Sequence, residues 1–192
     1  MQAHTDARPS PTSWLKGYYF TRFAVSAAWV ALAFTLGRSM PGLAAVMLVA
    51  YPLWDALANY IDARRSGGLG RNKPQALNFV VSVLTAVAVA IALGKSMNAV
   101  LAVFGVWAIL AGLFQLATAV RRWKTAGAQW AMILSGAQSA LAGGFFVKMA
   151  SGPATVGITD VAPYAAFGAF YFFVSAVWLA VSDARRKPVP VV

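Results

Sequence analysis

The stretch "PGLAAVMLVAYPLWDALANYI" (residues 41–61) is long and apolar enough to cross a membrane, yet it contains an aspartate, Asp55. A helix needs about 20 apolar residues to cross the hydrocarbon core, which is about 30 Å thick. Acidic side chains are rare inside such helices, because an unpaired charge is costly there. The stretch therefore predicts a transmembrane helix in which Asp55 has a partner or a role.

The composition of the whole chain agrees with a membrane protein. Of its 192 residues, 60% are hydrophobic and 11% are charged, and the mean hydropathy is +0.66. A soluble domain carries about 25% charged residues, so this chain lacks the polar side chains that cover a water-facing surface. No stretch alternates as a barrel strand does, and the predicted fold class is all-α. The predicted transmembrane helices are six: Tyr18–Leu36, Pro41–Ile61, Ala76–Leu93, Met97–Val120, Trp130–Val147 and Val161–Val181.

Short sequences recur along the chain at a constant spacing. "LGRSM" (36–40) returns as "LGKSM" (93–97), and the same offset of 57 residues carries Arg64-Arg65 onto Arg121-Arg122. We interpret the chain as three helical hairpins of one orientation, that is, as parallel repeats. The alternative, that hairpins rich in Ala, Val and Leu are alike by composition, explains a constant offset less well. The predicted boundaries are tails at 1–17 and 184–192, a transmembrane domain at 18–183, and repeats at 18–65, 76–122 and 130–186.

The basic residues are distributed unevenly between the two ends of the predicted helices. Thirteen of the sixteen Lys and Arg residues fall on one side, and Arg38, Lys95 and Lys148 fall on the other. Because cytoplasmic loops are enriched in Lys and Arg, both termini are predicted to be cytoplasmic in a bacterial inner membrane. Clustering between apolar segments also explains the net charge of +11 without nucleic acid, and predicts contacts with anionic lipids. The polar N-terminus has no apolar h-region, so we expect no signal peptide.

Residues that carry catalysis are nearly absent. The chain has no cysteine and no glutamate, and its one histidine is His4 in the N-terminal tail. Cysteine-based metal sites, disulfides and histidine-based acid–base chemistry are therefore excluded from the membrane region, and no P-loop, HExxH or G-x-S-x-G motif occurs. We expect no enzymatic activity, no cofactor and no metal.

Three features together resemble a known family. They are Arg22 in the first predicted helix, "MPG" (40–42) at the start of the second, and Asp55 late in the second, within three hairpin units of this length. In this pattern the chain resembles the HdeD family of small bacterial inner-membrane proteins, over about residues 20–186. The resemblance implies a stress-related role, including acid resistance, and supplies no catalytic residues. The chain departs from the pattern at "NA" (98–99), which replaces "PG", and in its longer third outer turn.

The position of Asp55 predicts an ion pair. Asp55 lies 15 residues after Met40 and Arg22 lies 15 residues before Gly37, so both sit at one depth, about 22 Å from the outer turn. We predict that Arg22 and Asp55 pair and lock the first hairpin. The alternative is that Arg22 extends to the lipid head groups while Asp55 meets water or an amide.

Two further groups of residues stand out on the predicted helices. Asn59 and Asp62 follow Asp55 at helical spacing and form a polar stripe toward Arg64-Arg65. Gly136, Ala140 and Gly144 are small residues at a spacing of four, which lets helix backbones approach each other closely. Whether they face a helix of the same chain or a second copy in a homo-oligomer is left open.

The sequence leaves three functional classes. The first is an HdeD-like, non-catalytic membrane protein with a stress-related role. The second is a small transporter or channel subunit, whose pathway forms between repeats or protomers. The third is a scaffold that binds other membrane proteins.

Overall fold

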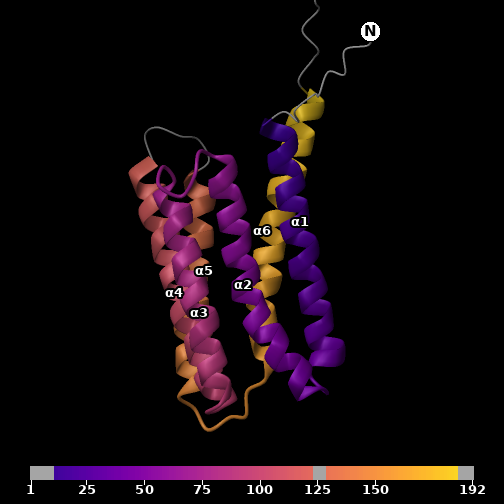
Figure 1. Cartoon of the computed structure of the whole chain (residues 1–192), viewed down its shortest axis with the longest axis vertical. Coiled ribbons are helices and arrows are strands. Elements are labelled where there is room, and N and C mark those ends of the chain that lie inside the picture. Colours follow the sequence, from indigo (N-terminus) through magenta and orange to yellow (C-terminus); the bar gives the residue numbers. More distant parts are fainter. Residues whose placement is uncertain (1–10, 123–128, 186–192) are drawn as a thin grey trace, which may run out of the picture.

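The computed structural model describes residues 11–122 and 129–185, and these form six long helices and one short π-helical segment (Figure 1). There is no strand within these ranges. The elements are α1 (Pro11–Leu32), η1 (Ala33–Gly37), α2 (Pro41–Arg65), α3 (Lys73–Leu93), α4 (Met97–Arg122), α5 (Gln129–Ala150) and α6 (Ile158–Arg185).

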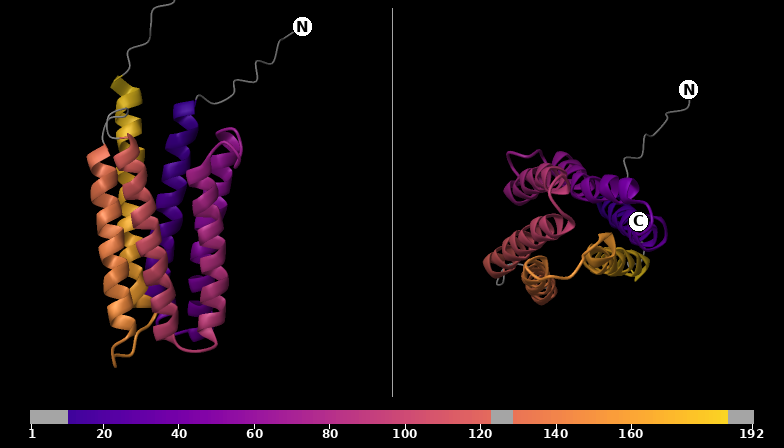
Figure 2. Two further views of the ribbon diagram at one scale, coloured as in Figure 1. Left: turned by 90° about the vertical axis from the view of Figure 1, so that its left-hand side faces the viewer. Right: turned by 90° about the horizontal axis from the view of Figure 1, so that it is seen from below.

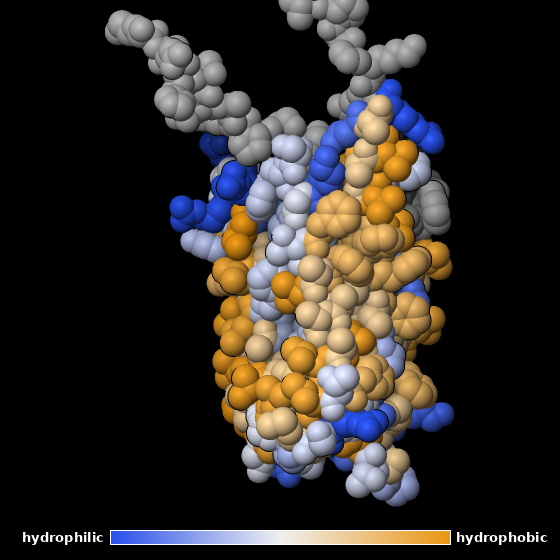
Figure 3. All heavy atoms as spheres, turned by 90° about the vertical axis from the view of Figure 1, so that its right-hand side faces the viewer, coloured by the Kyte–Doolittle hydropathy of each residue, from blue (hydrophilic) through white to orange (hydrophobic). Residues whose placement is uncertain are grey.

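Helix length and hydropathy identify an α-helical membrane protein, as predicted. Within the described ranges, five helical stretches are long and apolar enough to cross a membrane: Ser13–Gly37, Pro41–Arg65, Lys73–Leu93, Met97–Ala117 and Ile158–Arg185. α5 is not among them, so the sixth span stays a prediction. Apolar side chains cover the face formed by α1 and α6 between two more polar ends (Figure 3). Large apolar residues such as Trp178 and Leu141 are 73% and 76% exposed, which is typical of a lipid-facing surface.

The predicted N-terminal tail has to be corrected. α1 begins at Pro11, so residues 11–17 are the first turns of a helix and not part of a tail. Two contacts hold these turns: Lys16 Nζ lies 3.5 Å from Asp183 Oδ2 on α6, and the Trp14 ring lies 4.7 Å from the guanidinium carbon of Arg65 on α2. At the other end of the chain α6 continues through Arg185. Residues 1–10 and 186–192, the rest of the predicted tails, lie outside the described residues.

Local sequence explains where several helices begin. Pro41 opens α2 and Pro74 lies in the first turn of α3, positions where the missing N–H of proline costs nothing. α6 begins after Gly157, whose N–H donates to Asp160 Oδ2 over 2.7 Å. Asp160 is therefore an acidic residue of the first turn whose side chain reaches back to the start of the helix.

The helices pack as three close pairs. α4 packs most closely with α5, and α1 with α6 and α2 with α3 come next; α3 also packs on α4. Figure 2, seen from below, shows these pairs side by side around the bundle. Inside the predicted hairpins the backbones lie further apart, since α1 and α2, and likewise α5 and α6, approach closely at only a few points. Side chains such as Trp29, whose Nε1 donates to the Met47 carbonyl, bridge α1 to α2. The pairs are related by a shift of two helices along the chain: α2 with α3 corresponds to α4 with α5, and then to α6 with α1. This is the relation expected of three parallel repeats.

An aromatic core at the centre of the bundle supports the same relation. Tyr51 of α2, Trp107 of α4 and Tyr164 of α6 meet edge to face, with ring centroids 6.1 Å apart in both contacts. These residues are 56 and 57 positions apart, and so are Ser26, Ser82 and Ser139 on α1, α3 and α5. Each predicted repeat thus contributes one aromatic and one serine at matching places. The three repeats and their boundaries stay a prediction.

Candidate functional site

A polar cluster inside the membrane region is centred on Asp55. Arg22 of α1 forms an ion pair with Asp55 of α2 through its Nη2 and the carboxylate Oδ1. The two side chains are 12% and 21% exposed, so the pair is largely removed from the surroundings of the bundle. The structure therefore brings together the two charges that equal depth in the hairpin predicts to meet.

Two neutral side chains complete the coordination of this carboxylate. Asn59 Nδ2 donates to Asp55 Oδ2 over 3.0 Å and to the Asp55 backbone carbonyl over 2.8 Å. Ser82 Oγ of α3 donates to the same Oδ2 over 2.8 Å. Both carboxylate oxygens are thus engaged by donors, and these donors come from three helices. Such a group ties α1, α2 and α3 together at one depth.

The guanidinium of Arg22 is held on its other side by aromatic residues. Nη1 donates to Tyr18 Oη over 3.2 Å, and Tyr18 Oη donates to the Ala58 carbonyl over 3.2 Å. The Phe172 ring of α6 lies 4.1 Å from the guanidinium carbon, which is cation–π geometry. Two buried donors, Arg22 Nε and Trp54 Nε1, have no hydrogen-bond partner among the described residues. The cluster thus includes residues of four helices: α1, α2, α3 and α6.

The predicted polar stripe divides into two parts. Asn59 belongs to the cluster, whereas Asp62 does not contact Arg22 and accepts a hydrogen bond from Gln75 Nε2 of α3 over 3.2 Å. Asp62 therefore fastens the ends of α2 and α3 to each other. Sequence reasoning did not single out Tyr18, Ser82 or Phe172 for the cluster. Only Tyr18, one turn before Arg22, carries a signal in its spacing.

The predicted small-residue contact lies between α4 and α5 and needs one correction. A Cβ added to Gly136 would lie 2.9 Å from the Gly112 carbonyl, and one added to Gly112 would lie 2.6 Å from the Ala140 backbone nitrogen. A Cβ on Gly143 would lie 2.4 Å from the carbonyl oxygen of Gly105. Gly144 is exposed, and a Cβ there would meet no atom within 4 Å. Gly143 thus takes the place predicted for Gly144, and the contact is internal to the chain.

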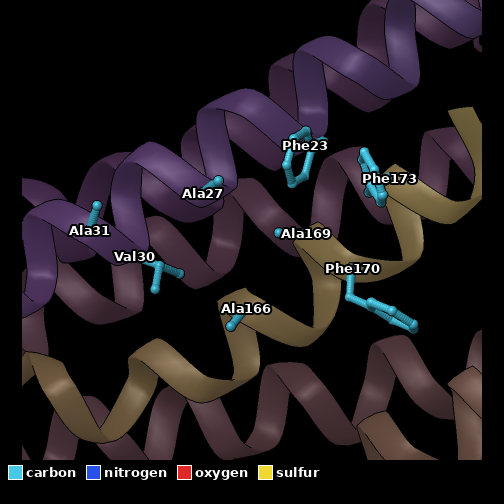
Figure 4. Close-up of a pocket in the computed structure, with 8 residues that line it drawn as sticks. All are labelled: Phe23, Ala27, Val30, Ala31, Ala166, Ala169, Phe170 and Phe173. Atoms are coloured by element: carbon cyan, nitrogen blue, oxygen red, sulfur yellow. The ribbon is translucent and has the colours of Figure 1, made fainter. Parts of the chain in front are cut away.

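An apolar groove lies between α1 and α6 (Figure 4). It has a volume of about 380 Å³ and is lined by Phe23, Ala27, Val30, Ala31, Ala166, Ala169, Phe170 and Phe173. The rings of Phe23 and Phe173 are 4.9 Å apart. The groove contains no charged side chain, so it does not extend the polar cluster.

The chemistry that the cluster supports is electrostatic. Within the described ranges, no three His, Cys, Asp or Glu side chains stand close enough together to hold a metal ion. The Asp55 carboxylate accepts from three side-chain donors, which come from α1, α2 and α3. What the cluster does is fix the relative positions of α1, α2, α3 and α6.

Part of the chain matches a known family. Residues 80–148 match DUF308, a short repeat of unknown function. The match begins in α3, includes most of α4 and α5, and contains the close glycine contact. It starts inside the second predicted repeat and ends inside the third. DUF308 includes the HdeD-like membrane proteins, which agrees with the resemblance seen in the sequence. No curated protein and no solved structure matches the chain.

Proposed function

We propose that this chain is a non-catalytic, HdeD-like protein of the bacterial inner membrane with a role in the response to stress, including acid stress. The observation that carries the non-catalytic part is that Asp55 is engaged by Arg22, Asn59 and Ser82 of the protein itself. Three donors use three of the roughly four acceptor sites of a carboxylate, so Asp55 serves chiefly to hold the helices together. The HdeD resemblance supports the stress role, and the DUF308 match supports that resemblance.

The stress role is tested by survival of acid shock. A strain that lacks the gene is expected to survive less well than its parent, and the wild-type gene on a plasmid should restore survival. The Arg22→Ala/Asp55→Ala variant should restore it poorly if the cluster holds the functional form, while Ser175→Ala, whose hydroxyl bonds only its own helix, should restore it fully. Equal survival of parent and deletion strain, with the protein present in the parent's membrane, contradicts the proposal.

A small transporter or channel subunit is the second candidate. It is favoured by the way α1 and α6 are joined to α2: the backbone of α1 lies close to α6 but close to α2 at few points, and side chains such as Arg22 and Trp29 bridge the wider gap to α2. A pathway would open between these two parts. Purified protein in liposomes would then carry ions or protons down an imposed gradient, and Asp55→Asn would change that flux. Liposomes that remain as tight as empty ones exclude this candidate.

A further inference from the structure

The turn between α2 and α3 carries a concentration of positive charge that the fold leaves uncompensated. Four exposed basic residues lie within ten positions there: Arg64, Arg65, Arg71 and Lys73. We call them the basic turn. The ion pairs among the described residues are Lys16–Asp183 and Arg22–Asp55, so none of the four has a carboxylate partner there. The nearby acid, Asp62, is bonded to Gln75 instead.

The backbone that carries these cations is firmly held. Gly67 and Gly68 have φ values of 100° and 94°, which side chains other than glycine rarely adopt. The N–H of Gly68 donates to the Ala63 carbonyl over 2.7 Å, and the Asn72 amide donates to the carbonyls of Ser66 and Gly68 over 2.6 and 3.1 Å. Asn72 therefore closes the turn across its width. The backbone positions of the four basic residues are therefore fixed before a ligand binds.

Aromatic rings position two of the arginines. The guanidinium carbon of Arg65 lies 4.7 Å from the centre of the Trp14 ring. Arg64 Nη1 donates to Tyr60 Oη over 3.1 Å, and the Tyr60 ring contacts Phe79 of α3 with centroids 5.8 Å apart. A guanidinium that lies against a ring keeps its outer N–H groups available for a phosphate, which it can bind through two parallel hydrogen bonds.

Arg71 is directed back over the turn. Its Cδ lies 3.5 Å from the place where a Cβ on Gly67 would stand, so its aliphatic part passes over the glycine. A larger residue at 67 would compete for this space and would also strain the backbone. Gly67 thus leaves space for the Arg71 side chain and also allows the backbone conformation of the turn.

From these contacts we propose that the basic turn is a binding site for the phosphate of an anionic phospholipid. The turn joins two helices that are long and apolar enough to cross a membrane, so it lies at the level of the head groups. Trp and Tyr side chains such as Trp14 and Tyr60 are typical of that level. Basic residues directly beside a transmembrane helix are the usual ligands of anionic lipids. Four cations in one turn favour a lipid with two phosphates, such as cardiolipin, over one with a single phosphate.

The test compares two variants of the full chain with equal loss of charge. The turn variant is Arg64→Gln/Arg65→Gln/Arg71→Gln, and its matched control is Arg38→Gln/Lys95→Gln/Lys148→Gln, which removes three exposed cations from the opposite end. Lipid binding to purified protein in a neutral detergent is measured by native mass spectrometry and by the thermal shift on adding cardiolipin, phosphatidylglycerol, phosphatidylcholine or inorganic phosphate. Circular dichroism checks that each variant is folded.

The expected order of binding to wild type and control is cardiolipin, then phosphatidylglycerol, with no specific binding of phosphatidylcholine. The turn variant should bind cardiolipin about 100-fold more weakly, at about fivefold for each cation removed. Unchanged binding by the turn variant, or an equal loss in the control, overturns the site. Equal stabilisation by inorganic phosphate overturns the lipid as its ligand.

A single substitution keeps the proposal testable if the triple variant does not fold. Arg71→Gln should weaken cardiolipin binding about fivefold, and Arg71→Lys should keep most of it. No difference between Arg71→Gln and wild type contradicts the proposal. These outcomes are independent of the stress role proposed above, since lipid binding is measured on purified protein without any survival assay.

Discussion

At the scale of single residues, Asp55 is stable in the membrane because its charge is surrounded by donors. An unpaired charge at the centre of a transmembrane helix costs at least about 2.5–3.5 kcal/mol. Here Arg22 supplies an opposite charge, and Asn59 and Ser82 bond the second carboxylate oxygen. Removing Arg22 or Asp55 leaves the other charge buried without a partner. This lowers stability more than replacing both charges with apolar side chains.

A double-mutant cycle on the ion pair measures this coupling. Arg22→Ala and Asp55→Ala should each lower the free energy of unfolding in detergent by about 3 kcal/mol, because each leaves a buried charge without its partner. The double variant should lose less than the sum of the two. The measurement is denaturant unfolding followed by circular dichroism. Strict additivity would mean that the two side chains do not interact.

The hydroxyl of Ser82 allows a finer test of the cluster. Ser82→Ala removes one donor to Asp55 and should cost about 0.6–1.7 kcal/mol, the range for interhelical hydrogen bonds in membranes. Ser175→Ala is the matched control, since its hydroxyl bonds the Tyr171 carbonyl of its own helix. In the Asp55→Ala background, the Ser82 substitution should lose its effect. An unchanged cost there would show that Ser82 acts through something other than Asp55.

At the scale of elements, the closeness of α4 and α5 depends on glycines that follow one helical face. Gly105 and Gly112 on α4, and Gly136 and Gly143 on α5, are each seven residues apart. Seven residues make almost two full turns of a helix, so both members of each pair point the same way. Gly144 lies about 80° further around α5 than Gly136. A spacing of four, which is what the sequence pattern displays, therefore leads off the interface at its far end.

Alanine substitutions distinguish the glycines inside the α4–α5 contact from Gly144, which lies outside it. Gly112→Ala and Gly143→Ala should each destabilise the protein by about 1–3 kcal/mol, because the new Cβ would force two backbones apart. Gly144→Ala should be neutral or stabilise by up to about 1 kcal/mol through helix propensity. Thermal unfolding in detergent, with all three variants side by side, measures the difference. A stable Gly112→Ala variant would contradict the close α4–α5 contact.

The helices differ in how well the sequence predicts them and the cluster residues that they carry. Hydropathy predicts where α2, α3 and α4 lie because membrane thickness and backbone hydrogen bonding leave few other solutions. The start of α1 at Pro11 was not predicted, because residues 11–17 do not continue the apolar run, and their contacts with α2 and α6 come from distant parts of the chain. The depth argument brought Arg22 and Asp55 together, since they share one hairpin. Ser82 and Phe172 come from distant segments, and no local pattern places them beside Arg22.

At the scale of the whole molecule, the three predicted repeats place the serines Ser26, Ser82 and Ser139 at matching positions on α1, α3 and α5. Ser139 of α5 lies 3.0 Å from Tyr164 Oη, and Ser26 of α1 is buried, as is Tyr51 of α2. Ser82 of α3, which lies between these two serines in the chain, makes a different contact. Its hydroxyl bonds Asp55 instead. In the predicted three-repeat arrangement, the ion pair is thus a specialisation of the first repeat.

The orientation of the whole molecule in the membrane is the remaining prediction. α1 begins and α6 ends at the same end of the bundle as the α2–α3 turn (Figure 1), and thirteen of sixteen basic residues were assigned to that side. Since the chain has no cysteine, single cysteines can report it directly. In intact spheroplasts a membrane-impermeant maleimide should label Ser151→Cys, whereas Ser66→Cys should react only after permeabilisation, because cytoplasmic turns carry the excess of Lys and Arg. A permeant maleimide serves as the control and should label both. Labelling of Ser66→Cys from outside would reverse the orientation, and would also remove the basic turn from the anionic leaflet in which its lipid ligand is expected.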